Sequence, residues 1–581
     1  MSDYDVVVIG GGINGLTAAG YLAKSGLKVG VFERRGQCGA HCDTVEVGTP
    51  GIWHNIHATW LLTGLNPAME DLDLPGHGLE LVGTDIAYAK EFLGATNCLV
   101  SLDPAETIAS VASFSQRDAA VLERLVQFFL EHWDEVLGAL RAFLTHSSGA
   151  ALGSSVLPVD ALLNALDLKV EPYELRRMSG FEALDLLFES DELKTTLASI
   201  SGFAGYPAIH REIGLIGSLV ASAFTGTLFP VHQATGGSHS LTHALVRTIV
   251  DYGGDIWTSC GVDRILVEGG KAIGIHLDPD GVLGGADITA KVVISNLTAV
   301  PTFVRLLGED VIGTAWADAI RRFSYDEQVV LAVNYALSGD PVFASAERAP
   351  GIQRCFTGCV GGESLSEMRQ FGVDLVTGVI SDATFANWYV PTRADPSQAP
   401  SGIHTGTLWL DVPPAPRRWH GKRLNGWQDW PRIAEALADE LTDGFEKYAP
   451  GFKDLVLERF VMTPADQERN NPSAVRGNWF GGSMLPEQSF SNRPVRGLIR
   501  EGSASRTFVP NLYLSNSIHP GGMTWLASGY VAATEVAQDM GTFSSSVWKT
   551  QAFDWYLSNI RSVPLNRGVS TQWLKQNTGG K

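Results

Sequence analysis

The first residues of the chain hold the pattern that most constrains its fold. Residues 4–9 are an apolar run rich in β-branched side chains, which is typical of a buried strand, and residues 16–23 have the composition of a helix. Between them, Gly10, Gly12 and Gly15 match the pattern G-x-G-x-x-G. The first glycine permits a tight turn, the second lets a pyrophosphate approach the backbone, and the third lets the helix pack on the strand. The stretch predicts a dinucleotide site with its phosphates at the N-terminus of the helix.

A second predicted strand, residues 28–32, indicates which dinucleotide fits. It ends at Glu33, which is 33 − 10 = 23 positions after Gly10. This spacing is close to the roughly 20 positions expected for the carboxylate that accepts hydrogen bonds from ribose hydroxyls. An acid at this place favours an unphosphorylated adenosine ribose and disfavours NADP. The alternative is a glycine-rich turn in another kind of α/β protein.

Composition and charge narrow the class of protein. The 581 residues are 45% hydrophobic and 18% charged, as in a globular protein of more than one domain. A net charge of −20 argues against a nucleic-acid partner. No apolar run reaches the ~20 residues of a transmembrane helix, and the N-terminus has no signal-peptide pattern, so we expect a cytoplasmic protein. His239 and His243 lie one helical turn apart, but no carboxylate completes a site, and we expect no metal.

Several blocks of the sequence resemble the phytoene dehydrogenase-like flavoproteins, which are related to bacterial carotenoid desaturases. The blocks include residues 6–47, 236–275 and 511–537. The resemblance implies an α/β fold with a Rossmann-like FAD-binding domain, whose parallel sheet is discontinuous in sequence, and a substrate domain with a mixed or antiparallel sheet and a helical cap. We expect residues 1–70, 230–310 and 495–540 to form the FAD-binding domain. Residues 71–229 and 311–494 would form the substrate domain, and residues 541–581 a C-terminal extension.

The same resemblance implies FAD as the cofactor and indicates where it binds. The stretch 511–540 reads as strand, turn and helix, and in the family such an element brings a helix N-terminus to the pyrimidine carbonyl of the flavin. A dehydrogenase that uses only NAD has no need of this returning element. The residues that we expect to bind the cofactor are Gly10, Gly12, Asn14, Gly15, Glu33, Arg34, Gly39, His41, Val262, Asn296, Pro520, Gly521, Gly522 and Met523.

Two histidines are candidates for a role in the reaction or in cofactor attachment. His41 stands where the family normally has a small residue, and by analogy with fumarate reductase flavoproteins it could bind the flavin covalently; Cys42 and Cys38 are alternative tethers. The competing interpretation is a histidine that only donates a hydrogen bond near the pyrophosphate. His519 is the candidate catalytic residue, as a base that accepts a substrate proton. It could instead only shape the turn at the flavin.

The resulting functional hypothesis is an FAD-dependent oxidoreductase. It would dehydrogenate a small to medium, partly polar organic substrate by hydride transfer to flavin N5, with O2, a quinone or another carrier as electron acceptor. The alternatives are a flavin amine or alcohol oxidase that releases hydrogen peroxide, and a non-catalytic flavoprotein. A homo-oligomer is possible, and the aromatic residues of the C-terminal extension predict docking on the body or on a second protein chain. Candidates for the pocket wall are Tyr206, Tyr325, Trp388, Tyr389, Trp409 and Trp479.

Overall fold

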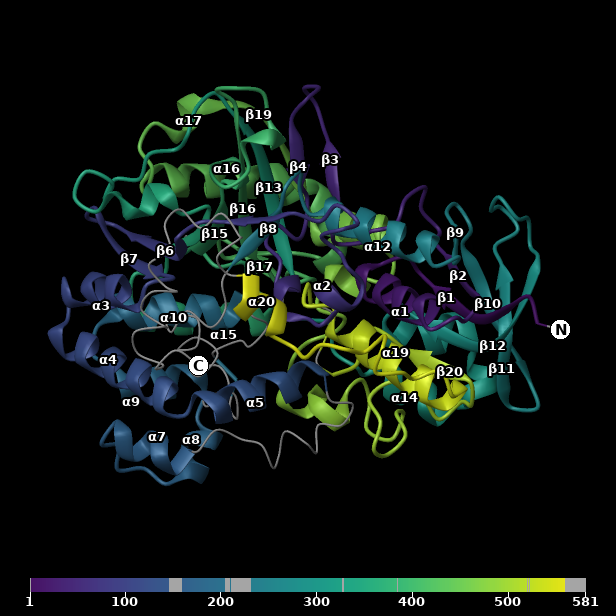
Figure 1. The fold of residues 1–581 in the computed structure, drawn as a ribbon. Coiled ribbons are helices and arrows are strands. Elements are labelled where there is room, and N and C mark those ends of the chain that lie inside the picture. The colour runs from purple at the N-terminus through teal and green to yellow at the C-terminus, as the bar shows by residue number, and fades with distance from the viewer. Residues whose placement is uncertain are drawn as a thin grey trace.

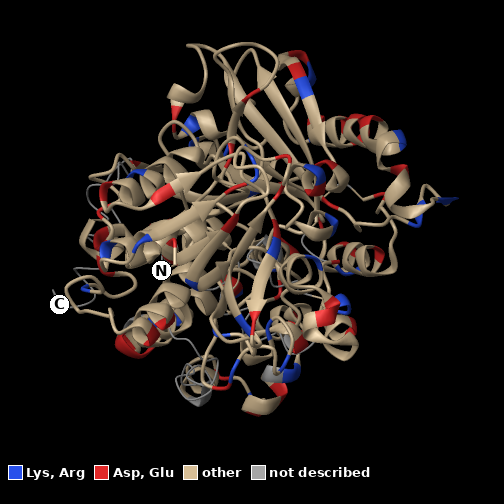
Figure 2. Cartoon of the chain, turned by 90° about the vertical axis from the view of Figure 1, so that its right-hand side faces the viewer, with Lys and Arg blue, Asp and Glu red and all other residues tan. Residues whose placement is uncertain are grey.

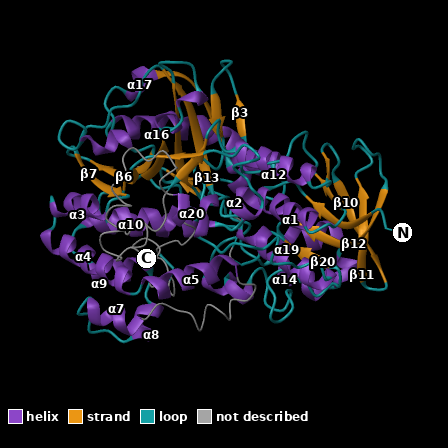
Figure 3. Ribbon diagram, in the orientation of Figure 1, coloured by secondary structure: helices purple, strands orange, loops and turns teal. Residues whose placement is uncertain are grey.

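The computed structural model describes residues 2–145, 159–203, 209–210, 231–326, 329–383, 385–519, 521 and 523–559. Two seven-stranded sheets organise the chain, and helices cover both of them (Figure 1; Figure 3). The predicted fold class is confirmed, because one sheet is of the Rossmann-like parallel type and the other is mixed. Tyr206 lies outside the described residues.

The first sheet collects strands from the two ends and the middle of the chain. Its parallel core runs in the order β20, β12, β1, β2, β9. These are Leu512–Leu514, Asp287–Ser295, Tyr4–Ile9, Val29–Phe32 and Asp255–Trp257. A hairpin of β10 (Val262–Glu268) and β11 (Lys271–Leu277) pairs antiparallel with the first half of β12. The strands of the core are short and apolar because both faces of the sheet are covered.

Three helices from distant parts of the sequence pack together beside this sheet. They are α1 (Ile13–Lys24), α12 (His239–Asp251) and α19 (Ala527–Met540). The approach of α19 to α1 depends on Gly529, because a Cβ there would lie 2.2 Å from the carbonyl oxygen of Asn14. The Gly529 N–H instead donates a hydrogen bond to the Asn14 side chain at 3.2 Å. The last helix of the domain is thus held against the turn at the beginning of the first.

The second sheet is mostly antiparallel, in the order β19, β13, β16, β15, β14, β6, β7. Only β6 and β14 are parallel neighbours. The strands are Val456–Met462, Val330–Leu337, His404–Asp411, Phe385–Tyr389, Thr357–Gly361, Ile86–Phe92 and Thr96–Ser101. One face packs on α16 (Trp430–Glu446), where the Tyr335 hydroxyl bonds to the Thr442 hydroxyl at 2.8 Å. The opposite face carries Trp409 and Tyr389, whose rings contact each other.

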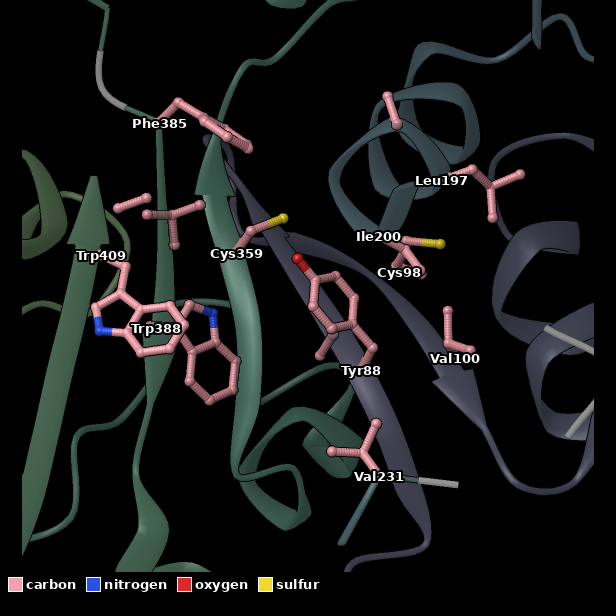
Figure 4. Packing of buried hydrophobic residues seen from close by; sticks show 14 of the residues in the cluster. Tyr88, Cys98, Val100, Leu197, Ile200, Val231, Cys359, Phe385, Trp388 and Trp409 are labelled. Carbon is pink, nitrogen blue, oxygen red and sulfur yellow. The ribbon is translucent and has the colours of Figure 1, made fainter. Parts of the chain in front are cut away.

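Helices cover one end of the second sheet. They are α3 (Pro104–Ala112), α4 (Gln116–Glu131), α5 (Trp133–Thr145), α7 (Val159–Ala165), α8 (Pro172–Arg177), α9 (Gly180–Leu187), α10 (Asp191–Phe203) and α15 (Leu365–Thr377). Figure 4 shows Leu197 and Ile200 of α10 near Cys98 and Val100 on β7. The periodicity of residues 115–147 predicts a single long helix, but the structure has a break at His132 between α4 and α5. A helical hydrophobic pattern continues across the break because both helices present their apolar sides to the same core.

The described part of the C-terminal extension docks on the body of the protein. Trp548 is buried, stacks on Tyr21 of α1 with ring centroids 5.1 Å apart, and donates its Nε1–H to the Thr534 hydroxyl at 2.9 Å. The buried carboxylate of Asp71 accepts the Lys549 and Thr550 backbone N–H groups, at 3.2 and 3.1 Å. These contacts attach residues 541–559 to α1, to α19 and to the end of the short helix α2 (Ala68–Asp71).

Charged side chains of both signs are distributed over the described part of the chain (Figure 2). Figure 2 shows Lys and Arg interspersed with Asp and Glu along the helices and loops of the described chain. Within that part of the chain, none of the helices has both the length and the hydropathy that a membrane crossing requires.

Candidate cofactor and substrate site

A cavity lies at the carboxyl edge of the parallel strands and extends to the second sheet. Its empty volume, including the open mouth, is about 1040 Å³. Its lining residues come from the glycine turn, from the loop after β2, from residues 58–60, from the stretch after β12, from β16 and from two later loops. The lining residues are Gly10, Gly12, Ile13, Asn14, Glu33, Gly39, Ala40, His41, Cys42, Ala58, Thr59, Trp60, Asn296, Leu297, Thr298, Trp409, Asn471, Ser473, Ala474, Asn478, Trp479, Phe480, Gly481, Asn516, Met523 and Thr524.

The glycine turn forms one end of this cavity. Gly10 has a φ of +90°, which a residue with a side chain adopts only at a cost. Gly12 is the N-cap of α1 and provides no capping side chain, so the first N–H groups of the helix have no side-chain acceptor at that position. A Cβ on Gly12 would lie 2.6 Å from the Asn296 amide nitrogen, and one on Gly15 would lie 2.7 Å from the Gly10 carbonyl oxygen. The turn therefore presents bare backbone and a helix N-terminus to the cavity, as an anionic phosphate requires.

Glu33 is held at the end of β2 and lines the same end of the cavity. Its carboxylate accepts the Gly11 N–H at 2.7 Å and the Arg35 N–H at 2.8 Å. These two bonds orient the side chain over the glycine turn. Arg34, which we expected to bind the cofactor, is exposed and is not among the lining residues. The neighbouring Arg35 instead pairs with the buried Asp43.

The loop after β2 brings His41 into the wall of the cavity. Burial, with a contribution from the positive charge of Arg35, lowers the pKa of His41 to about 4, so its imidazole is neutral near pH 7. The His41 Nε2 atom is buried and has no hydrogen-bond partner. Burial raises the pKa of Cys38 and of Cys42 to about 12, so neither thiol is a thiolate near pH 7.

Aromatic side chains form the other end of the cavity. Trp409 of β16 packs edge-to-face on Trp479 at 4.6 Å, and Trp60 approaches from the segment after β4 (Trp53–Asn55). Two of the predicted pocket-wall residues, Trp409 and Trp479, therefore line the cavity. Tyr325, Trp388 and Tyr389 are buried in the described structure but do not line it.

Residues 471–481 are a functional segment that the sequence reasoning did not identify. Six of its residues besides Trp479 line the cavity. The loop is shaped by Asn478, whose side-chain oxygen accepts the Phe480 and Gly482 N–H groups at 3.1 and 2.8 Å. The available signal was the polar and glycine-rich run Gly477-Asn478-Trp479-Phe480-Gly481, which is unusual for either a strand or a helix.

A buried arginine supports this loop from behind. The Arg493 guanidinium donates to the carbonyl oxygens of Phe480, Gly481 and Gly482 at 3.0–3.1 Å. It also donates to the carbonyl oxygens of Ser483 at 3.0 Å and Gln488 at 3.4 Å. Only 2% of the residue is exposed, so the charge is solvated almost entirely by backbone carbonyl groups. Arg493 and the Ser517 hydroxyl, which donates to the Gly481 carbonyl oxygen at 2.5 Å, thus support the cavity wall at Phe480 and Gly481 from outside the cavity.

Several predicted cofactor residues meet in the cavity, and others do not. Gly10, Gly12, Asn14, Glu33, Gly39, His41, Asn296 and Met523 line it. Gly15 lies behind the turn, in contact with Gly10 and Asn296. Val262 begins β10, and Gly521 accepts the Ser528 hydroxyl with its carbonyl oxygen; neither lines the cavity. Pro520 and Gly522 lie outside the described residues.

His519, the predicted catalytic residue, does not line the cavity. Its ring lies between Phe143 and Phe490, with centroids 5.0 and 5.1 Å away, and 4% of the residue is exposed. Burial, with a contribution from Arg493, lowers the pKa of His519 to about 3.

Taken together, the parallel sheet, the glycine turn and the acidic strand end define a dinucleotide-binding protein of the Rossmann type. Residues 8–72 match the model of the NAD(P)-binding Rossmann-like domain. The chain is 30% identical over 573 residues to the pyridine nucleotide-disulfide oxidoreductase domain-containing protein 2 of Rattus norvegicus, covering 93% of this chain and 94% of the relative. It is 27% identical over 571 residues to one of the subunits of the limonene dehydrogenase of Castellaniella defragrans, covering 94% and 96%.

Further relatives at lower identity include a prolycopene isomerase and a phytoene desaturase. Among solved structures, a putrescine oxidase double mutant is similar in fold, with a TM-score of 0.57, 16% identity and coverage of 93% of this chain and 99% of the other. The chain belongs to the phytoene dehydrogenase-like family and is an oxidoreductase. The resemblance drawn from the sequence is therefore confirmed.

Proposed function

We propose that the protein binds FAD in the described cavity and dehydrogenates a small to medium organic substrate. The observation that carries the proposal is the continuity of the cavity, which runs from the bare glycine turn and Glu33 to the aromatic wall of the second sheet. One end suits phosphates and a ribose, and the other suits a planar ring next to an organic substrate. When bound, FAD would accept a hydride from the substrate.

The residues present fit this cofactor. The first N–H groups of α1 would hold the pyrophosphate, and the Glu33 carboxylate would accept the ribose hydroxyls. Buried polar atoms of Thr59 and Trp479 line the cavity without a hydrogen-bond partner in the described structure, as does His41 Nε2. Such atoms are costly unless a ligand or water satisfies them. Backbone near Val262 would meet the adenine, as the family resemblance implies.

The protein's own residues would orient the substrate and exclude water. Trp60, Trp409 and Trp479 enclose the end of the cavity on the side of the second sheet. For His519 we propose the turn-shaping role rather than the role of base, because its ring is packed between two phenylalanines and lies outside the lining. The substrate proton would then pass to solvent or to another acceptor at the cavity.

The proposed function is tested with the purified protein and its cofactor. We expect a flavin absorption spectrum, release of FAD rather than FMN on chromatography, and anaerobic bleaching by at least one alicyclic or polyene compound. Reduction of an artificial dye without peroxide supports the dehydrogenase. Peroxide release with amines or alcohols would instead support the flavin oxidase. A flavin that dithionite reduces, but that no tested substrate reduces, would favour the non-catalytic flavoprotein.

We also propose that His41 is bonded covalently to the cofactor. The proposal is supported by a neutral imidazole whose unpartnered Nε2 lines the cavity, and by thiols at Cys38 and Cys42 that are protonated near pH 7. We expect the yellow colour to stay with the pellet after acid precipitation of the wild type, and to move to the supernatant for His41→Ala. His57→Ala, which removes the adjacent ring at 4.8 Å, is the matched control and should keep the colour in the pellet. Colour in the wild-type supernatant would rule out the bond.

A further inference from the structure

A second cavity lies in the substrate-domain half of the molecule. Its empty volume, including the mouth, is about 1390 Å³. It is enclosed by α9, α10 and α15, by the end of β16 and by the stretch that follows β16. Apolar side chains dominate the walls, among them Phe181, Met368, Phe371, Leu375 and Phe385. A largely apolar lining of this kind suits the apolar part of an organic molecule.

One carboxylate faces this apolar space without a partner. Asp411 is the last residue of β16, and its side chain makes no hydrogen bond or ion pair within the described part of the chain. Burial raises its pKa to about 7. Three other charged residues line the cavity and differ from Asp411. Asp326 and Arg476 form an ion pair at 2.6 Å, and Arg417 is exposed to solvent. His210 also lies in the wall.

The second cavity shares a wall with the first. Trp409 lines the first cavity and Asp411 the second, and residues two apart on a strand point to the same face of the sheet. Their Cα atoms are therefore about 6.6 Å apart along the strand. A nearby loop also contributes to both cavities, since Ala474 and Asn478 line the first cavity and Arg476 lines the second. The two cavities are therefore neighbours on the same face of the second sheet.

We propose that the second cavity binds the apolar body of the substrate, and that Asp411 accepts a hydrogen bond from a hydroxyl or ammonium group on it. The inference rests on the proposed function, since it assigns the substrate class of the same site. The walls exclude water from the hydrocarbon part, and the single carboxylate favours a molecule with a donor over one with an anionic end. Asp411 is on this proposal a specificity-determining residue and takes no part in the oxidation itself.

Calorimetric binding to the cofactor-containing protein tests the proposal with three probes of equal chain length: decylamine, 1-decanol and decanoate. In the wild type we expect the two donor-bearing probes to bind at least tenfold more tightly than decanoate. Asp411→Asn keeps an acceptor oxygen but removes the charge, so it should weaken decylamine about tenfold and leave 1-decanol within about threefold. Asp411→Leu should weaken both. Asp280→Asn, the same change in an exposed loop of the first sheet, should alter neither.

A second variant tests the location of the probes without touching the carboxylate. Val376 lines the cavity and is 55% exposed, so Val376→Trp should narrow the mouth and weaken all three probes while the protein stays folded. Equal affinities for the three probes in wild type and Asp411→Leu, tightest binding of decanoate, or no binding at all would overturn the proposal. Loss of FAD from the purified protein would count against the proposed function alone. With a donor-bearing substrate, Asp411→Leu should raise KM and leave kcat and the flavin-to-protein ratio unchanged.

Discussion

Gly12→Ala is expected to reduce FAD affinity by ten- to a hundredfold, which corresponds to about 1.4–2.8 kcal/mol. The added methyl carbon would lie 2.6 Å from the Asn296 amide nitrogen, at the place where the phosphates need bare backbone. Backbone strain does not contribute, because the φ of −73° and ψ of 160° at Gly12 are open to alanine. The effect should therefore appear mainly in cofactor binding, and in the apoprotein it should be limited to a shift of the Asn296 side chain. The measurement is calorimetric titration of the apoprotein with FAD, together with the flavin-to-protein ratio after gel filtration.

Gly138→Ala is the matched control for that experiment. Gly138 is exposed in α5, and a Cβ there meets no atom within 4 Å. We expect unchanged FAD binding and a gain of about 0.5–1 kcal/mol in the free energy of unfolding, because alanine loses less backbone entropy in a helix than glycine does. A Gly12→Ala protein that retains FAD at the wild-type ratio and affinity would contradict the assignment of the phosphate site.

Arg493→Met is expected to lower the free energy of unfolding by about 3–5 kcal/mol. The substitution keeps much of the side-chain volume but removes the guanidinium donors from five carbonyl oxygens. Two of these oxygens keep a second donor, Gly481 from the Ser517 hydroxyl and Ser483 from the Gln488 amide. Urea unfolding followed by far-ultraviolet circular dichroism provides the measurement. FAD affinity should fall as well, because Phe480 and Gly481 form part of the cavity wall. Arg493→Lys should recover only part of the loss, since an ammonium group cannot reproduce the planar fork of donors.

The control for Arg493→Met is the same substitution at an arginine that is exposed on a helix surface. Arg124 of α4 is exposed, and Arg124→Met should change the free energy of unfolding by no more than about 0.5 kcal/mol. A loss of less than 1 kcal/mol in Arg493→Met would show that water replaces the guanidinium, and the loop would then not depend on this side chain.

The parts of the site that were predictable are those encoded by neighbouring residues. Gly10, Gly12 and Glu33 lie in one strand–turn–helix–strand unit, so their spacing alone brings them to the same edge of the sheet. His41 follows within eight residues of Glu33 and also reaches the cavity. Asn296 and Met523 were predictable only from the family resemblance, because each follows a strand that joins the first sheet from far along the chain.

His519 shows that the chemistry of a residue type does not predict whether the residue reaches the site. A histidine in a glycine-bearing turn is a reasonable base on sequence grounds, yet the fold places it between Phe143 and Phe490, outside the cavity lining. The same limit applies to Arg34 and Arg35: the sequence does not show which of two adjacent arginines turns inward. In the structure Arg35 pairs with Asp43, and Arg34 points to solvent.

The sequence by itself determined the class of cofactor site, because a glycine turn between a strand and a helix has few uses and its geometry is local. Only the tertiary structure decided what surrounds that site. The packing of the loop at residues 471–481 on the glycine turn and the second cavity at Asp411 depend on contacts between residues tens to hundreds of positions apart. Arg493 supports that loop from 12 and 13 positions away. Such contacts form because the two sheets and their helices bury apolar surface together. No local pattern records which polar side chain this packing leaves facing a cavity.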